Sequence, residues 1–165
     1  MTFAIHQAAA PVFTRALNNL SAMIDKTLAA GVSEATLLEA RLAPDMHPFP
    51  RQIQMASDSA KGAVARLAGV EPPAMPDTET TIAELKARIA ATIAYVNSVE
   101  AAALDGAEDR EVVLKFPGAE MKFTGADFLT GFALPNFFFH ITIAYALLRA
   151  SGAPIGKMDF LGGAR

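Results

Sequence analysis

The sequence predicts an all-α protein, a four-helix bundle with a small β-hairpin between its third and fourth helices. Four long segments carry apolar side chains at helical spacing, and a short segment before the last of them alternates polar and apolar residues. With 165 residues, 52% of them hydrophobic and 19% charged, the chain is long enough to bury one sizeable core. We therefore expect a single domain over residues 1–165, with the helices packed in an antiparallel-type bundle.

The first long helix is expected over residues 4–29, where apolar side chains recur every three or four positions. Gly31 follows as a residue that readily ends a helix. Pro11 lies inside the range, so the helix either begins near Pro11 or kinks there. Ser33 then caps a short helix that ends before Pro44.

The second long helix is expected over residues 50–68, and Gly69 ends it. The segment PDMHPFP, residues 44–50, forms a turn before this helix because its three prolines prevent helix propagation. The segment VEPPAMPD, residues 70–77, is a stiff linker that follows it.

A third helix is expected to begin at an N-cap, Thr78 or Thr80, and to run to about residue 104. The segments REVVLKF and EMKFTG follow, and both alternate polar and apolar residues. Because PGA separates them, they predict a β-hairpin.

The fourth long helix is expected over residues 126–150, broken or bent near Pro135, and the tail after it reads as a loop. Residues 128–148 carry no charge and approach the length of a membrane span. Polar and helix-breaking residues in mid-run, such as Gly131 and Asn136, favour the centre of a soluble bundle or a subunit interface instead.

Charge and composition limit the classes of function. The net charge is −3, the pI is about 5.6, and no cluster of Lys and Arg is present, so nucleic-acid binding is not expected. The absence of cysteine excludes disulfides and thiolate metal sites and suits a cytoplasmic location. The N-terminal segment lacks the positive region of a signal peptide, so export is not expected.

Asn136 and His140 are the polar pair of the apolar fourth helix. Their spacing of four residues places both side chains on one helical face. Buried polar groups need partners, and this pair could satisfy each other, backbone carbonyls near Pro135, or Gln52 of the second helix. Asn136 could also cap the C-terminal half of a helix broken at Pro135.

The segments LAPDMHPFPRQIQMASDSAKGAVARLAG and LPNFFFHITIAYALLRASGAPIGKMDFLG resemble an uncharacterised bacterial domain family. That family is related to the DinB/YfiT-like proteins, a group of proposed metalloenzymes, and the resemblance covers essentially the whole chain. It implies an up-down-down-up four-helix bundle and a homodimer. In metal-binding relatives it implies a divalent ion held by one histidine of the second helix and a His-x-x-x-His pair of the fourth. Some relatives use the ion in thiol-dependent transfer or in hydrolysis.

Residue by residue, the fourth-helix pair of that family corresponds here to Asn136 and His140. The second helix contains no histidine; the nearest is His47 in the preceding turn, and Gln52 and Asp58 are polar candidates on the helix itself. The resemblance therefore implies His140, Asn136, Gln52, Asp58 and His47 as candidate ligands for Zn, Ni or Fe. One imidazole and one amide make an unusual donor pair for such metals.

Two hypotheses follow. In the first, the metal site is degenerate or absent, the Asn136–His140 pair organises a buried network, and the protein binds a small molecule beside it. The alternative is a divalent-metal-dependent enzyme of DinB-like type, using His140, Asn136 and an oxygen of the second helix. The phenylalanines at 137–139 fit a core, a dimer interface or the wall of an apolar pocket.

Overall fold

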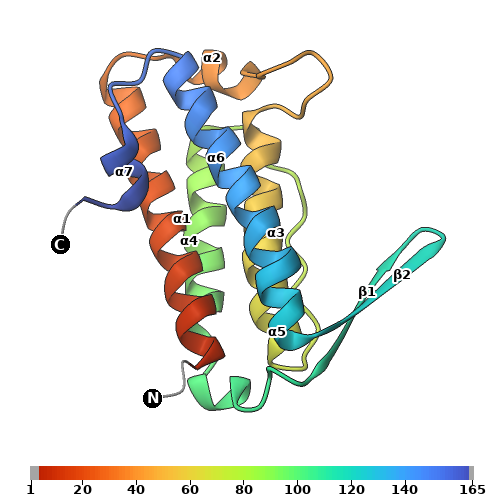
Figure 1. The fold of residues 1–165 in the computed structure, drawn as a ribbon. Helices are drawn as coiled ribbons and strands as arrows, with labels where there is room; N and C mark the ends of the chain where they lie inside the picture. Colours follow the sequence, from red (N-terminus) through yellow and green to blue (C-terminus); the bar gives the residue numbers. More distant parts are fainter. Residues whose placement is uncertain (1–3, 164–165) are drawn as a thin grey trace.

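Four long helices form the body of the molecule. The computed structural model describes residues 4–163, and its long helices are α1 (Ile5–Ala29), α3 (Phe49–Leu67), α4 (Ile82–Ser98) and α6 (Leu134–Ala150). Helices α1 and α3 each pack against both α4 and α6. In Figure 1, α1 and α6 run upward while α3 and α4 run downward. The predominantly helical class is confirmed.

The predicted hairpin is confirmed as two antiparallel strands, β1 (Glu111–Phe116) and β2 (Ala119–Thr124). The turn between them needs Gly118, whose φ of 77° is disfavoured for residues with a side chain. The hairpin extends away from the bundle in Figure 1, and its base anchors it through the buried Val112 and Leu114.

The first two predicted helical regions agree with the structure. Helix α1 begins at Ile5, so Pro11 lies inside it rather than at its start. Helix α2 (Glu34–Glu39) begins after Ser33, whose side chain accepts a hydrogen bond from the backbone N–H of Thr36. A proline lies in the first turn of α3. Backbone N–H groups there have no acceptor within the helix, so a residue without an N–H is tolerated.

The third helix begins later and ends earlier than predicted. Its N-cap is Thr81, not Thr78 or Thr80, because only Thr81 has an acidic residue, Glu84, three positions later. The Thr81 hydroxyl accepts from the Glu84 N–H at 3.2 Å, and the Glu84 carboxylate accepts from the Thr81 N–H at 3.0 Å. The helix ends at Ser98, and a separate 3-10 turn, η1 (Ala101–Leu104), follows.

The chain remains helical through Pro135, so of the two predicted alternatives, a break or a bend, the break is wrong. A short α5 (Gly125–Asp127) and a π-helical segment, η2 (Phe128–Ala133), lead directly into α6. Pro135 occupies the first turn of α6, and the π segment before it absorbs the change in hydrogen-bond register that a residue without an amide proton imposes.

The C-terminal tail also differs from the loop that the sequence predicts, because it contains helix α7 (Lys157–Leu161). The Asp159 carboxylate accepts from the Gly156 N–H at 2.7 Å and pairs with Lys26 of α1. Asn19 of α1 donates to the Phe160 carbonyl at 3.0 Å. Contacts with a helix more than a hundred residues away therefore order this segment.

The helical stretch Gly125–Ala150 is long and apolar enough to cross a membrane by length and composition, and 39% of its most apolar window is buried. Its inner face packs against α1 and α3, as in a soluble globular domain. The outer face keeps large apolar side chains in contact with solvent, including Phe139, which is 54% exposed.

Candidate functional site

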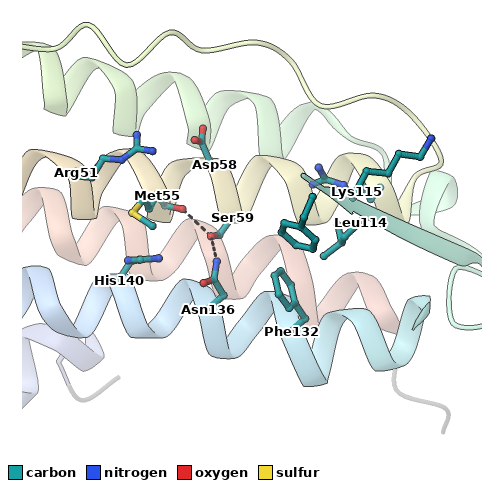
Figure 2. A pocket seen from close by; sticks show the side chains of 11 residues that line it. Arg51, Met55, Asp58, Ser59, Leu114, Lys115, Phe132, Asn136 and His140 are labelled. Atoms are coloured by element: carbon teal, nitrogen blue, oxygen red, sulfur yellow. Dashed lines mark hydrogen bonds between the residues drawn. The ribbon is translucent and has the colours of Figure 1, made fainter. Parts of the chain in front are cut away.

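A cavity of about 320 Å³ lies where α3, α6 and the hairpin meet (Figure 2). Helix α3 contributes five residues: Arg51, Met55, Asp58, Ser59 and Arg66. Facing them is a stripe with a spacing of four residues: Phe132, Asn136 and His140. The end of β1 closes the cavity with three consecutive residues: Leu114, Lys115 and Phe116.

His140 of α6 is buried, with 4% exposure, and is held by α3. Its Nδ1 lies 2.9 Å from Oε1 of Gln52, and Nε2 of Gln52 donates to the His47 carbonyl at 3.0 Å. Because Gln52 uses its NH₂ group on His47, its oxygen must accept from His140. This arrangement assigns the proton to Nδ1 and leaves Nε2 with a lone pair and no protein partner among residues 4–163.

The surroundings of His140 favour its neutral form. Burial lowers the pKa of His140, and the positive charges of His47 and Arg51 act in the same direction. The neutral Nε2 can accept a hydrogen bond, take up a proton or bind a metal ion. A ring nitrogen whose opposite N–H is held by an oxygen is also the usual arrangement of a metal-bound histidine.

Asn136 is half-buried and bonds to a different residue of α3. Its amide nitrogen donates to Oγ of Ser59 at 2.7 Å, and Ser59 donates to the Met55 carbonyl at 2.7 Å (Figure 2). Asn136 and His140 therefore do not satisfy each other, and Asn136 is not a helix cap. The Asn136 Oδ1 atom has no partner in the described part of the chain and, like the Nε2 atom of His140, is an acceptor on a cavity-lining side chain.

The interpretation that Gln52 satisfies His140 agrees with the structure, whereas Ser59 is a partner that sequence reasoning missed. The available signal was spacing: Ser59 follows Gln52 by seven residues, two helical turns, and so lies on the same side of α3.

Asp58 lies on the other side of α3 from Asn136 in Figure 2. Its Oδ1 pairs with Lys61 at 3.0 Å and with Arg88 of α4 at 2.9 Å. Arg88 also pairs with Asp77 at 3.1 Å and with Glu79 at 2.9 Å, both in the linker before α4. The structure thus joins Asp58 to an ion network around the buried Arg88, not to His140.

The linker acids complete this network. Asp77 pairs with Arg51 as well as Arg88, and Glu79 accepts from Gln54 at 2.9 Å. Burial would raise the pKa of Glu79, but hydrogen bonds from Arg88 and Gln54 outweigh it, so the pKa is lowered. The sequence signal for this network was Arg88, a charged residue between the buried Leu85 and Ile89.

The candidate metal ligands do not form a complete donor set. His140 and Asn136 retain free acceptor atoms, Gln52 and Asp58 are hydrogen-bonded or paired elsewhere, and His47 is exposed in the turn before α3. Within residues 4–163, no three His, Asp or Glu side chains are grouped so that they could hold a metal ion. One imidazole and one amide oxygen are fewer than the three protein ligands of an ordinary catalytic zinc site.

Comparisons with known proteins agree with the resemblance that the sequence indicates. Residues 5–161 match the family described as "Domain of unknown function (DUF1993)". Among solved structures, the chain is similar to a DinB family member protein from Shewanella denitrificans, with 37% identity and a TM-score of 0.90, over 97% of this chain and 93% of that one. No curated protein matches the chain.

Proposed function

The chain belongs to the DUF1993 family, and from this premise we propose that it is a DinB-like bundle protein that binds a small molecule in the cavity between α3, α6 and the hairpin. One observation carries the proposal: the cavity is lined by two side chains, His140 and Asn136, that each keep a free acceptor atom. Its volume of about 320 Å³ lies within the range of small-molecule sites.

The lining suits a ligand with an apolar body and a hydrogen-bond donor. Met55, Leu114, Phe116 and Phe132 provide apolar contact, while Nε2 of His140 and Oδ1 of Asn136 accept hydrogen bonds. The bonds from His140 to Gln52 and from Asn136 to Ser59 hold both acceptors in place before a ligand arrives. Such preorganisation reduces the entropic cost of binding.

The absence of tryptophan from the chain allows a site-specific test. Phe132→Trp places a fluorescent reporter in the cavity wall, and Met158→Trp places a matched one on the exposed surface of α7. With 1-octanol as the probe, a neutral chain bearing one hydroxyl donor, we expect a saturable change in Phe132→Trp emission only. Equal changes in both variants, or none in Phe132→Trp, would contradict the proposal.

The outer face of α6 supports a homodimer as part of this proposal. This face is uncharged from residue 134 to residue 148, and Phe139 on it is 54% exposed. Large exposed apolar patches are common at subunit interfaces. Light scattering coupled to size exclusion should give twice the chain mass for the natural protein and a monomer for Phe139→Glu, with Thr142→Glu on the same face as a second variant. A monomeric natural protein would contradict a dimer.

A second candidate function is a divalent-metal-dependent enzyme of DinB-like type, acting in thiol-dependent transfer or in hydrolysis. The observation that favours it is the fixed tautomer of His140, which directs a lone pair away from Gln52. A third donor would require His47 to turn inward or Asp58 to leave Arg88 and Lys61.

Metal analysis of protein purified without an affinity tag tests this candidate. Stoichiometric zinc, nickel or iron, together with a lower melting temperature after chelation that His140→Ala abolishes, would support it, because an ion that binds only the folded chain stabilises it. Metal-free protein whose melting is insensitive to added ions would contradict it.

The up-down-down-up bundle connectivity and a cytoplasmic location belong to the same proposal. The directions of the helices in Figure 1 and the likeness to the DinB family member support the first, and the lack of cysteine suits the second. An experimental structure and cell fractionation, respectively, test them.

A further inference from the structure

The cavity lining carries more positive than negative charge. Arg51 and Arg66 come from α3 and Lys115 from β1, whereas Asp58 provides the negative charge of the lining. The whole chain has a formal net charge of −3, so this excess is local and opposite in sign to the protein as a whole. A local field of this kind attracts and orients ligands of the opposite charge.

The Asp58 carboxylate is already paired and does not neutralise the positive charge of the cavity. Its Oδ1 pairs with Lys61 at 3.0 Å and with Arg88 at 2.9 Å, and the Asp58 carboxylate points away from Asn136 in Figure 2. Arg51 is itself paired with Asp77. The charge that the cavity offers to a ligand therefore comes from Arg66.

The Arg66 side chain lies against Gly62, where the absence of a side chain leaves room for its guanidinium. Its Nη1 atom lies where a side chain at Gly62, one helical turn earlier, would place a Cβ atom. Glycine weakens the interior of a helix, and here its lack of a side chain lets the guanidinium fold back along α3. Within the described residues, Arg66 makes no ion pair.

Lys115 does not face the cavity in the same way, because it lies between Leu114 and Phe116 on β1 and its side chain points away from Asn136 and His140 in Figure 2. Glu120 faces it across the hairpin, but the Glu120 carboxylate pairs with Lys122 at 3.4 Å. No acidic side chain in residues 4–163 forms an ion pair with Lys115. Its neighbour Phe116, a 44% exposed cavity-lining residue, and Phe132 supply apolar surface for the same cavity.

We propose that the ligand of the cavity is a small amphipathic anion, with a carboxylate or phosphate group bound by Arg66 and a hydrogen-bond donor directed to His140 and Asn136. This inference rests on the proposed function, because it names the ligand class of the same cavity. The apolar body of the ligand lies along the α6 stripe, which extends about 12 Å from Phe132 to His140 at 1.5 Å per residue.

Four probes that share one apolar chain separate charge from burial: octanoate, octyl phosphate, 1-octanol and octylammonium. Calorimetric titration into the full-length chain, below the micelle concentration of each probe, should show at least one anion binding about tenfold more tightly than 1-octanol and the cation most weakly. Comparison of octanoate with octyl phosphate identifies the preferred anion. The preference should decrease as salt is raised, since exposed charges are screened.

Charge-removing variants locate the effect. Arg66→Gln should bring the anions close to the affinity of 1-octanol. Arg15→Gln and Lys157→Gln each remove one positive charge from an exposed position outside the cavity and should leave all four affinities unchanged. Gly62→Ala keeps every charge but displaces the Arg66 guanidinium, so it should weaken anion binding without changing 1-octanol binding.

Two results would overturn the anion class and leave the proposed function standing: equal affinities for anions and 1-octanol, or an anion preference that survives Arg66→Gln. Tightest binding of octylammonium would overturn it as well. If no probe binds and Phe132→Trp emission is also unchanged by 1-octanol, both the ligand class and the proposed function are wrong.

Discussion

Helix α3 has two polar faces that differ in how their polar groups are matched. Toward α6, Gln52 and Ser59 hold His140 and Asn136 by neutral hydrogen bonds, and each of these two side chains keeps a free acceptor. Toward α4, Asp58 and Lys61 join a network of opposite charges centred on Arg88. The first face lines an open cavity and suits ligand binding, whereas the second connects the linker to the bundle and suits stability.

On the face of α3 that packs toward α4, one polar atom among residues 4–163 also lacks a hydrogen-bond partner. The Nε atom of Arg88 is buried and is the one such side-chain atom without a partner in the described residues. The other guanidinium nitrogens bond to Asp58, Asp77, Glu79 and the Pro76 carbonyl. The Arg88 guanidinium therefore makes several charged bonds despite one unpaired N–H. Removing the guanidinium would leave several acids without this partner at once, as expected of a structural network.

The largest expected effect is therefore on the α4 face. Arg88→Met should lower the free energy of unfolding by about 3 kcal/mol, because it leaves Asp58, Asp77 and Glu79 without their shared cation. The lower end of the range for buried pairs is appropriate, since two of the acids are partly exposed. Urea denaturation measures it, with the exposed Arg15→Met as the matched control. A loss of less than about 1 kcal/mol would show that the network contributes little beyond exposed ion pairs.

On the α6 face, His140→Ala should lower the free energy of unfolding by about 1–3 kcal/mol, because it removes a buried side chain and leaves Oε1 of Gln52 unpaired. The double variant with Gln52→Leu should recover part of the loss, because it removes the orphaned acceptor. Denaturation of the two single variants and the double variant forms a cycle that isolates the pair. Strict additivity would contradict a specific His140–Gln52 bond.

Asn136→Ala should have a smaller effect, about 1 kcal/mol or less, because both Asn136 and Ser59 are only half-buried and water can replace the lost bond. The same variant should reduce 1-octanol binding, measured with the Phe132→Trp reporter. Asn18→Ala, an exposed asparagine on α1, is the control. If Asn136→Ala lost as much stability as His140→Ala, the half-buried Asn136–Ser59 bond would contribute as much as the buried His140–Gln52 bond. That result would contradict the expected difference between them.

The smallest expected effect is a pH dependence that belongs to His140. Because its pKa is lower in the folded chain than its ordinary value of 6.5, the unfolded chain binds more protons as the pH falls below that value. The stability that the neutral ring contributes is complete above about pH 6.5 and is lost as the pH falls toward the lowered pKa.

The natural protein should consequently lose more stability between about pH 7 and about pH 5 than His140→Gln does. His6→Gln, on the partly exposed start of α1, serves as the control. Urea denaturation at several pH values measures the difference. Parallel pH profiles for the natural protein and His140→Gln would show that the ring titrates equally in the folded and unfolded chains.

Much of the α6 face could be predicted from the sequence. The spacing of Asn136 and His140 places them on one helical face, and Gln52 was among the expected partners. The α4 face could not be predicted in the same way, because Asp77 and Glu79 lie in a proline-rich linker without periodicity. Only the path of that linker across α3 and α4 brings its acids to Arg88.

The sequence by itself determined where the four long helices and the hairpin lie, since apolar spacing, N-caps and glycines act within a few residues of the chain. Even the Thr81 cap was present in the sequence through Glu84, three residues later. The tertiary structure decided which polar atoms are satisfied and which remain free: Ser59 for Asn136, Arg88 for Asp58, and no partner within the described chain for Nε2 of His140. The physical reason is that hydrogen bonds and ion pairs between helices depend on the rotation and height of each helix relative to its neighbours, which local spacing does not specify.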